Sequence, residues 1–219
     1  MNQRGPVTIL LIALAATRAQ AQSTELDTPP RWAIAPYVGV ARHSLVGTHL
    51  GVIPDRDHVF VGIHLTAALW RTRRLTFAFA PEVVPLLVIT NNPIYEIVDT
   101  FDGRHEFEVG RGPVTGFAVS PIGFEGQLGV GHAWRAYATS AVGAVWFTRD
   151  VPVAYSRRFN YTFEVGGGAL WQFRPRTSLR VGYKFHHLSN AFTALQNPGI
   201  DGAVFLAGIE RTLGGHSDK

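Results

Sequence analysis

The second half of this chain alternates, residue by residue, between apolar side chains and polar or small ones. In segment 160–173, one face carries Tyr161, Phe163, Val165, Ala169, Trp171 and Phe173. Segment 179–189 repeats the pattern, with Leu179, Val181, Tyr183 and Phe185 on one face and Arg180, Gly182, Lys184 and His186 on the other. A period of two is that of a β-strand, whose successive side chains point to opposite faces. The chain is therefore expected to consist of strands with one apolar and one polar face.

The overall composition is apolar for a chain that has no segment suited to a membrane helix. Only 16% of the residues are charged, 23 are glycine and the mean hydropathy is +0.08. A spanning helix needs about 20 consecutive apolar residues, and no such run follows the N-terminal segment. Strands of a transmembrane barrel produce this balance, because only every second residue meets lipid.

The N-terminus has the pattern of an export signal. Arg4 precedes an apolar run, Val7 to Ala16, and Ala19-Gln20-Ala21 offers a cleavage site of the A-x-A kind. We expect residues 1–21 to be a signal peptide and residues 22–219 to form a single domain. The chain has no cysteine, so packing or a closed hydrogen-bond network must stabilise it outside the cytoplasm.

Eight segments have the strand pattern, and the connections between them alternate in length. The segments are 31–42, 58–70, 75–89, 114–130, 134–148, 160–173, 179–189 and 203–213. The short connections are 71–74, 131–133 and 174–178, and the long ones are 43–57, 90–113, 149–159 and 190–202. Outer-membrane barrels have short periplasmic turns and long outer loops. We predict an all-β fold, an eight-stranded antiparallel transmembrane β-barrel of the outer-membrane type, in the outer membrane of a Gram-negative cell.

Prolines are the main departure from this strand pattern, because proline cannot donate to a β-ladder. Pro36, Pro81, Pro85 and Pro121 all fall inside expected strands. The third segment is therefore expected to end near Ala80, with 81–89 bulged or above the membrane. The apolar phase of the fourth segment shifts near Pro121, which indicates a bulge.

Several classes of partner and site are excluded or disfavoured. The 20 basic and 16 acidic residues form no compact basic run with interleaved aromatic residues, so a nucleic-acid partner is not expected. The histidines lack metal-ligand spacing, so no metal site is expected. Five polar residues of the expected strands instead predict a polar network inside a narrow barrel: Glu125, Gln127, Glu164, Arg180 and Lys184.

Residues 187–201 combine the groups needed for acyl transfer. Ser189 offers a hydroxyl nucleophile, His187 a base two residues earlier, and Asp201 a carboxylate to orient the imidazole. Asn190 and Asn197 offer donors for a developing oxyanion. Asn197-Pro198-Gly199 is a strong turn signal that could return Asp201 to the preceding strand. Since His187 and Ser189 share the apolar face of their strand, we expect the pair to face lipid.

These residues resemble the signature of a known family. His187-Leu188-Ser189-Asn190-Ala191, followed by Asn197-Pro198-Gly199, is similar to the lipid A 3-O-deacylases, the PagL or acyloxyacyl hydrolase family. The resemblance implies a serine esterase, requiring no cofactor, that hydrolyses the 3-linked acyl chain of lipid A in lipopolysaccharide. It implies Ser189 as nucleophile, His187 as base, Asp201 as acid, Asn197 in the oxyanion hole and Asn190 as support.

Two positions depart from that family's pattern. Its usual acid is glutamate, whereas this chain has Asp201, and Phe192 stands where glycine is usual. Two other readings therefore stay open. The chain could be a non-catalytic outer-membrane barrel, structural or adhesive, whose site has drifted. It could also be a soluble exported barrel that binds lipid.

Overall fold

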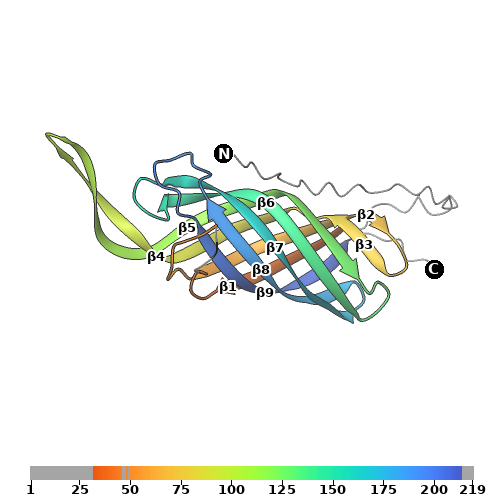
Figure 1. Cartoon of the computed structure of the whole chain (residues 1–219). Coiled ribbons are helices and arrows are strands. Elements are labelled where there is room, and N and C mark those ends of the chain that lie inside the picture. The colour runs from red at the N-terminus through yellow and green to blue at the C-terminus, as the bar shows by residue number, and fades with distance from the viewer. Residues whose placement is uncertain (1–31, 46–47, 49, 214–219) are drawn as a thin grey trace, which may run out of the picture.

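The backbone forms a single antiparallel sheet that closes into a ring (Figure 1). The computed structural model describes residues 32–45, 48 and 50–213. Its strands are β1 (Trp32–Ala41), β2 (His58–Arg71), β3 (Leu75–Phe79), β4 (Glu82–Thr100), β5 (Gly103–Leu128), β6 (Trp134–Val151), β7 (Arg157–Arg174), β8 (Thr177–Ser189) and β9 (Ile200–Leu213). β1 pairs with β2 and β9, which closes the ring. Because β3 and β4 both pair with β2 and β5, they share one position in it. The predicted eight-stranded barrel is confirmed.

The two ends of the barrel differ in the connections that they carry. The short turns 72–74, 129–133 and 175–176 lie at one end, together with the first described strand residue and the last. The longer connections lie at the other end, as the alternation of lengths predicts. The expected signal peptide, residues 1–21, lies outside the described residues. The part of the chain that the structure describes contains no helix that is long and apolar enough to cross a membrane.

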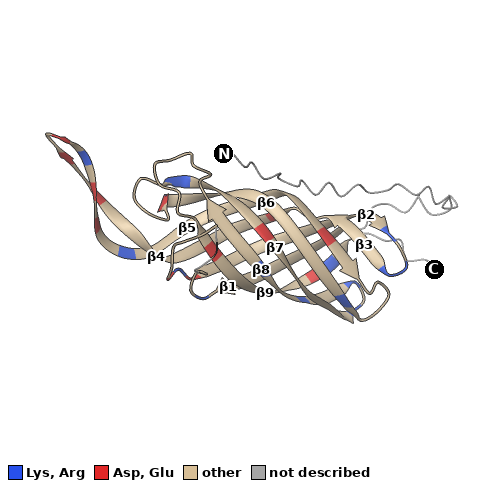
Figure 2. Cartoon of the chain, viewed as in Figure 1, with Lys and Arg blue, Asp and Glu red and all other residues tan. Residues whose placement is uncertain are grey.

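Residues 90–113 were expected to be a long outer loop, and this expectation is wrong. β4 and β5 instead stay paired from Asn92 opposite Gly112 to Thr100 opposite Gly103. They form an arm, residues 92–112, that extends beyond the barrel and carries both acidic and basic residues (Figures 1 and 2). The register shifts twice at the root of the arm, after Ile89 and after Ile94. These shifts break the period of two, which is why the alternation does not reveal the strands.

Three of the four prolines expected inside strands coincide with irregularities in the ladder, whereas Pro36 lies in a regular stretch of the β1–β2 pairing, opposite Ile63. Pro81 separates β3 from β4, and Pro85 lies within a register shift of the β4–β5 pairing. Pro121 lies within the shift between Val119 and Ile122, so the predicted bulge is confirmed. The expected break after Ala80 is also observed. Residues 82–89 nevertheless remain in the barrel wall, paired with β2, because the bulges accommodate residues that cannot donate.

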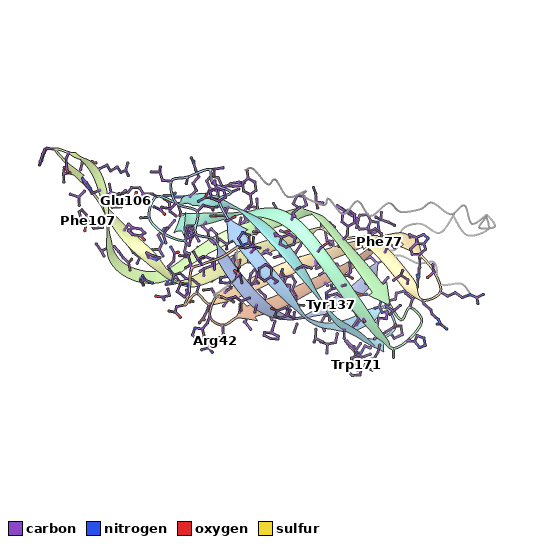
Figure 3. The ribbon with its side chains drawn as sticks, in the orientation of Figure 1. Arg42, Phe77, Glu106, Phe107, Tyr137 and Trp171 are labelled. Carbon is purple, nitrogen blue, oxygen red and sulfur yellow. The ribbon has the colours of Figure 1, made fainter. Side chains whose placement is uncertain are left out.

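The barrel has its polar side chains inside and apolar side chains outside. Trp70, Trp134, Trp146 and Trp171 are exposed on the outer surface, and Figure 3 shows Phe77 and Trp171 at the end opposite the arm. The predicted interior network is confirmed. Arg180 contacts Glu125 and lies 3.0 Å from Glu210, while the Lys184 Nζ atom lies 2.7 Å from Glu82 and 2.9 Å from Glu164. Paired and hydrogen-bonded charges of this kind can remain buried.

The interior changes from polar to apolar toward the end with the long connections. The buried apolar cluster there includes Phe60, Leu87, Val114, Phe147, Leu188 and Ile200. Leu188 is fully buried and lies between His187 and Ser189 in the chain. Packing of this inward side chain therefore fixes the two neighbours that point the other way.

We predict that Glu125→Ala strongly destabilises the barrel. The side chain is fully buried and contacts both Arg180 and His64. Its removal takes from the buried Arg180 cation one of the two acidic partners, Glu125 and Glu210, that it contacts. The free energy of unfolding should fall by about 3–5 kcal/mol, measured by urea titration of the refolded protein. Glu108→Ala is the control, since it breaks only the exposed ion pair with Arg111 and should cost at most about 1 kcal/mol. Equal losses in both variants would contradict the prediction.

Candidate active site

His187 and Ser189 project from the outer surface of β8. Arg180, Lys184, His186 and Leu188 are buried inside the barrel, whereas Val181 and Tyr183 are exposed outside. His187 and Ser189 are in phase with the exposed set because they alternate with the buried one. The outward orientation expected from the sequence is therefore observed.

A serine, a histidine and an aspartate form a continuous line of contacts at this place. The His187 Nε2 atom lies 3.2 Å from the Ser189 Oγ atom, and the Nδ1 atom lies 2.6 Å from the Asp201 Oδ1 atom. The β8–β9 register puts Asp201 directly opposite His187. With its proton on Nδ1, the imidazole donates to the carboxylate and leaves Nε2 free to accept from the hydroxyl. The pairing of β8 with β9 thus brings Asp201 back beside His187, as the turn signal at 197–199 suggests.

Asp201 is completely buried although its strand position faces outward. The connection between β1 and β2 covers it: the Thr48 hydroxyl and the Gly51 amide both donate to Oδ2, the latter at 2.9 Å. The Leu45 amide donates to the Asp201 carbonyl at 2.8 Å. A side chain on Gly51 would put its Cβ atom 2.6 Å from the Asp201 Cγ atom. These contacts hold one carboxylate oxygen, so the other is left to the imidazole.

Sequence reasoning missed Thr48 and Gly51. Gly51 and Asp201 are 150 residues apart, and no spacing rule connects a threonine in one loop with an acid in another. The local sequence of this connection, which mixes aliphatic, glycine and polar residues, does not single out either position.

Asn190 and Asn197 shape the turn that follows the serine. The Asn190 backbone amide donates to the Asn197 Oδ1 atom at 2.9 Å, and the Asn190 Nδ2 atom donates to the Gln196 carbonyl at 2.6 Å. Asn190 is fully buried, and both its backbone amide and its side-chain amide bond within the turn, so it holds the turn together. The Asn197 Nδ2 atom has no hydrogen bond to any residue that the structure describes, and remains available as a donor.

The turn is closed by backbone conformations that normally favour glycine. Ala191 and Phe192 have φ values of 51° and 60°, in the left-handed region. Glycine would adopt this conformation more easily than Phe192, which is 86% exposed. Gly199 has a φ of 62°, and a Cβ atom there would lie 3.1 Å from the His187 Cε1 atom. The turn therefore packs directly against the imidazole.

The arrangement matches that needed to activate a hydroxyl for attack on an ester. An imidazole within reach of a hydroxyl can take its proton, and a carboxylate on the far nitrogen stabilises the resulting cation. Among the residues that the structure describes, no group of three or more histidine or acidic side chains is placed to hold a metal ion.

Comparisons with known proteins give the same architecture. A family model described as "Lipid A 3-O-deacylase (PagL)" matches residues 93–210, which include the serine, the histidine and the aspartate but not Thr48 or Gly51. The crystal structure of the outer-membrane enzyme PagL superposes with a TM-score of 0.56 at 12% identity, covering 80% of this chain and 97% of that one. Neisserial surface protein A gives 0.51 at 11% identity, covering 83% and 97%. These identities establish the barrel fold alone. Comparison with curated proteins gave no match.

We predict that Thr48→Val destabilises the loop over Asp201. Valine keeps the shape of threonine but leaves a buried carboxylate oxygen with one donor fewer. The free energy of unfolding should fall by about 1–3 kcal/mol, as measured by urea titration. Thr48→Ser retains the hydroxyl and is the matched control. A valine variant as stable as the serine variant would show that the contact contributes nothing.

Proposed function

The chain belongs to the lipid A 3-O-deacylase (PagL) family, whose model matches more than half of its 219 residues, and we propose that it is a serine esterase. It is an outer-membrane β-barrel. The proposed reaction removes the 3-linked acyl chain of lipid A. The observation that carries the proposal is the contact line Ser189–His187–Asp201 on a surface that faces lipid.

The position of the hydroxyl limits the substrate. Ser189 lies at the outer end of β8, next to exposed apolar side chains of the wall such as Tyr161 and Phe163. A group at this place meets membrane lipid at the boundary between hydrocarbon and headgroups. In the outer leaflet of a Gram-negative cell that lipid is lipopolysaccharide, and its ester-linked chains begin at that depth. We further propose that residues 1–21 are removed on export, leaving residues 22–219 as one domain.

The reaction proceeds in two proton-coupled steps. Ser189 Oγ attacks the ester carbonyl while His187 Nε2 takes the hydroxyl proton. The tetrahedral intermediate collapses, the acyl–oxygen bond to the sugar breaks, and His187 returns the proton to the departing 3-hydroxyl. A water molecule, deprotonated by His187, then attacks the acyl-serine; the acyl–Oγ bond breaks, His187 returns the proton to Ser189 Oγ, and the fatty acid is released. Asp201 stabilises the imidazolium in both steps.

Asn197 is the proposed oxyanion donor. Its Oδ1 atom accepts from the Asn190 amide, which turns the Nδ2 atom away from the turn. Donors fixed before the reaction stabilise developing charge without reorganisation. The hydrogen bond from the Asn190 amide holds the Asn197 side chain by its oxygen and leaves its nitrogen free to donate, which supports this proposed role.

The β1–β2 connection offers a reason why aspartate can replace the usual glutamate. Asp201 lies directly across from His187 and needs no longer side chain to reach Nδ1. Thr48 and Gly51 bind its second oxygen and fix the carboxylate in this position. They are positioning residues, because they act on the reaction only through Asp201.

We predict that Ser189→Ala abolishes deacylation. Without the hydroxyl no acyl-enzyme forms, so lipid A from cells that produce the variant should keep its 3-linked chain, whereas lipid A from wild-type producers should lose it. Mass spectrometry of extracted lipid A measures the difference. The variant should insert and fold normally, since Ser189 is not part of the core. If lipid A from cells that produce folded wild-type protein also keeps its 3-linked chain, the proposed function is rejected and a non-catalytic barrel is favoured.

We predict that Asn197→Ala lowers kcat by roughly a hundredfold or more, as expected for loss of an oxyanion donor. The loss should fall on kcat rather than on KM, because the oxyanion exists only in the transition state. Turnover of a chromogenic fatty-acid ester by the refolded protein in detergent gives both constants. Asn91→Ala is the control, because Asn91 lies on β4, across the barrel from β8. Near-wild-type turnover would eliminate Asn197 as the donor.

A further inference from the structure

A cavity of about 490 Å³ lies at the end of the barrel with the long connections. The end of β6, the start of β7 and the β6–β7 and β8–β9 connections form it, and Glu106 contributes from the arm (Figure 3). We name it the headgroup cavity, lined principally by Trp146, Tyr155, Arg157, Arg158, Phe159 and Leu195. Its volume is within the usual range for small-ligand sites.

A row of aromatic rings connects the headgroup cavity with the serine. Tyr161 lies directly opposite Ser189 in the β7–β8 ladder. The Phe159 ring centroid is 5.2 Å from that of Tyr161 and 6.0 Å from that of Trp146. Directly opposed residues share a face of the sheet, so the serine and the cavity are on the same outer surface. The cavity lies farther from the hydrocarbon than the serine does.

Hydrogen bonds join the cavity wall to the turn that carries the proposed oxyanion donor. The Gln196 carbonyl accepts from Asn190 Nδ2 at 2.6 Å and from Ser156 Oγ at 3.2 Å. Arg157 Nε donates to the Thr193 carbonyl at 2.6 Å. A ligand in the cavity therefore occupies a fixed place relative to Ser189.

The cavity contains two arginines with unused donors. Within the described chain, Arg157 uses only Nε, which leaves its terminal nitrogens without a partner. Arg158 is 60% exposed and its one ion pair, with Asp150, is long at 3.9 Å. The lining also contains two acids. Asp150 makes that long ion pair, and Glu106 already accepts from the Tyr155 amide at 3.4 Å. Guanidinium groups bind phosphate through paired hydrogen bonds.

We propose that the headgroup cavity binds the phosphorylated glucosamine headgroup of the substrate, with Arg157 and Arg158 facing a phosphate. This proposal rests on the proposed function for the identity of the ligand. Lipid A is a phosphorylated glucosamine disaccharide, and cleavage of an ester at Ser189 brings the sugar ring next to that serine. The aromatic rings offer flat apolar faces to the sugar, and the arginines offer donors to its anionic group.

The test compares two lipid A substrates that differ only in their phosphates. Wild type should hydrolyse the phosphorylated form with a kcat/KM about tenfold or more above that of the dephosphorylated form, an advantage typical of a charge-assisted contact. Arg158→Gln should reduce this preference, and the double variant with Arg157→Gln should remove it. Arg111→Gln, an exposed arginine of the arm paired with Glu108, is the matched control. Equal use of both substrates by wild type would overturn the proposal.

Two further measurements distinguish a loss of headgroup binding from a general loss of activity. Hydrolysis of a short chromogenic ester, which has no headgroup, should stay within about twofold of wild type in Arg158→Gln, because that side chain makes no contact with the turn. A parallel loss on this ester would show that the arginine acts only through structure. Calorimetric titration of the Ser189→Ala protein with the two lipids measures binding without turnover. Preferential binding of the phosphorylated lipid by Ser189→Ala, together with no deacylation by the wild type, would support the cavity and reject the esterase function. Equal binding of the two lipids would reject the cavity.

Discussion

Closure of the backbone hydrogen-bond ladder between β1 and β9 is the constraint on which the rest of the structure depends. In hydrocarbon, every unpaired backbone group costs several kcal/mol, so a sheet in a membrane must have no free edge. Closure of so few strands leaves a narrow interior that side chains must fill. The alternation of each strand then sends polar residues inward and apolar residues outward. The same ladder sets the register of β8 against β9, and with it the contact between His187 and Asp201.

The interior has two layers with different consequences. The charged layer around Arg180 and Glu125 holds several strands together through hydrogen-bonded ion pairs, in which each buried charge depends on its partner. The apolar layer lies behind the proposed active site, where Leu188 is buried directly between the two outward-facing residues of β8. A close-packed interior yields little to displacement. The outer surface can therefore carry a precise arrangement of side chains although lipid, which is fluid, covers it.

The sequence predicted the features that depend on short-range periodicity. The period of two identified the strands and the polar interior, and the spacing of His187 and Ser189 placed both on the outer surface. It failed for the arm, because register shifts near Ile89 and Ile94 interrupt the alternation. It also failed for Thr48 and Gly51, whose role comes from a contact between distant parts of the chain. Pro81, Pro85 and Pro121 indicated irregular positions correctly, although Pro36 did not and residues 82–89 stayed in the wall.

The place of Asp201 links chemistry to assembly. Its carboxylate needs β8 for the imidazole, β9 for its own backbone, and the β1–β2 connection for the two donors that cover it. These elements come from opposite ends of the chain and meet only where the first strand joins the last. An incomplete barrel therefore lacks an oriented carboxylate, and its serine is an ordinary alcohol. The proposed hydrolytic competence would begin with completion of the ring, so that lipids encountered during export would not be exposed to an active nucleophile.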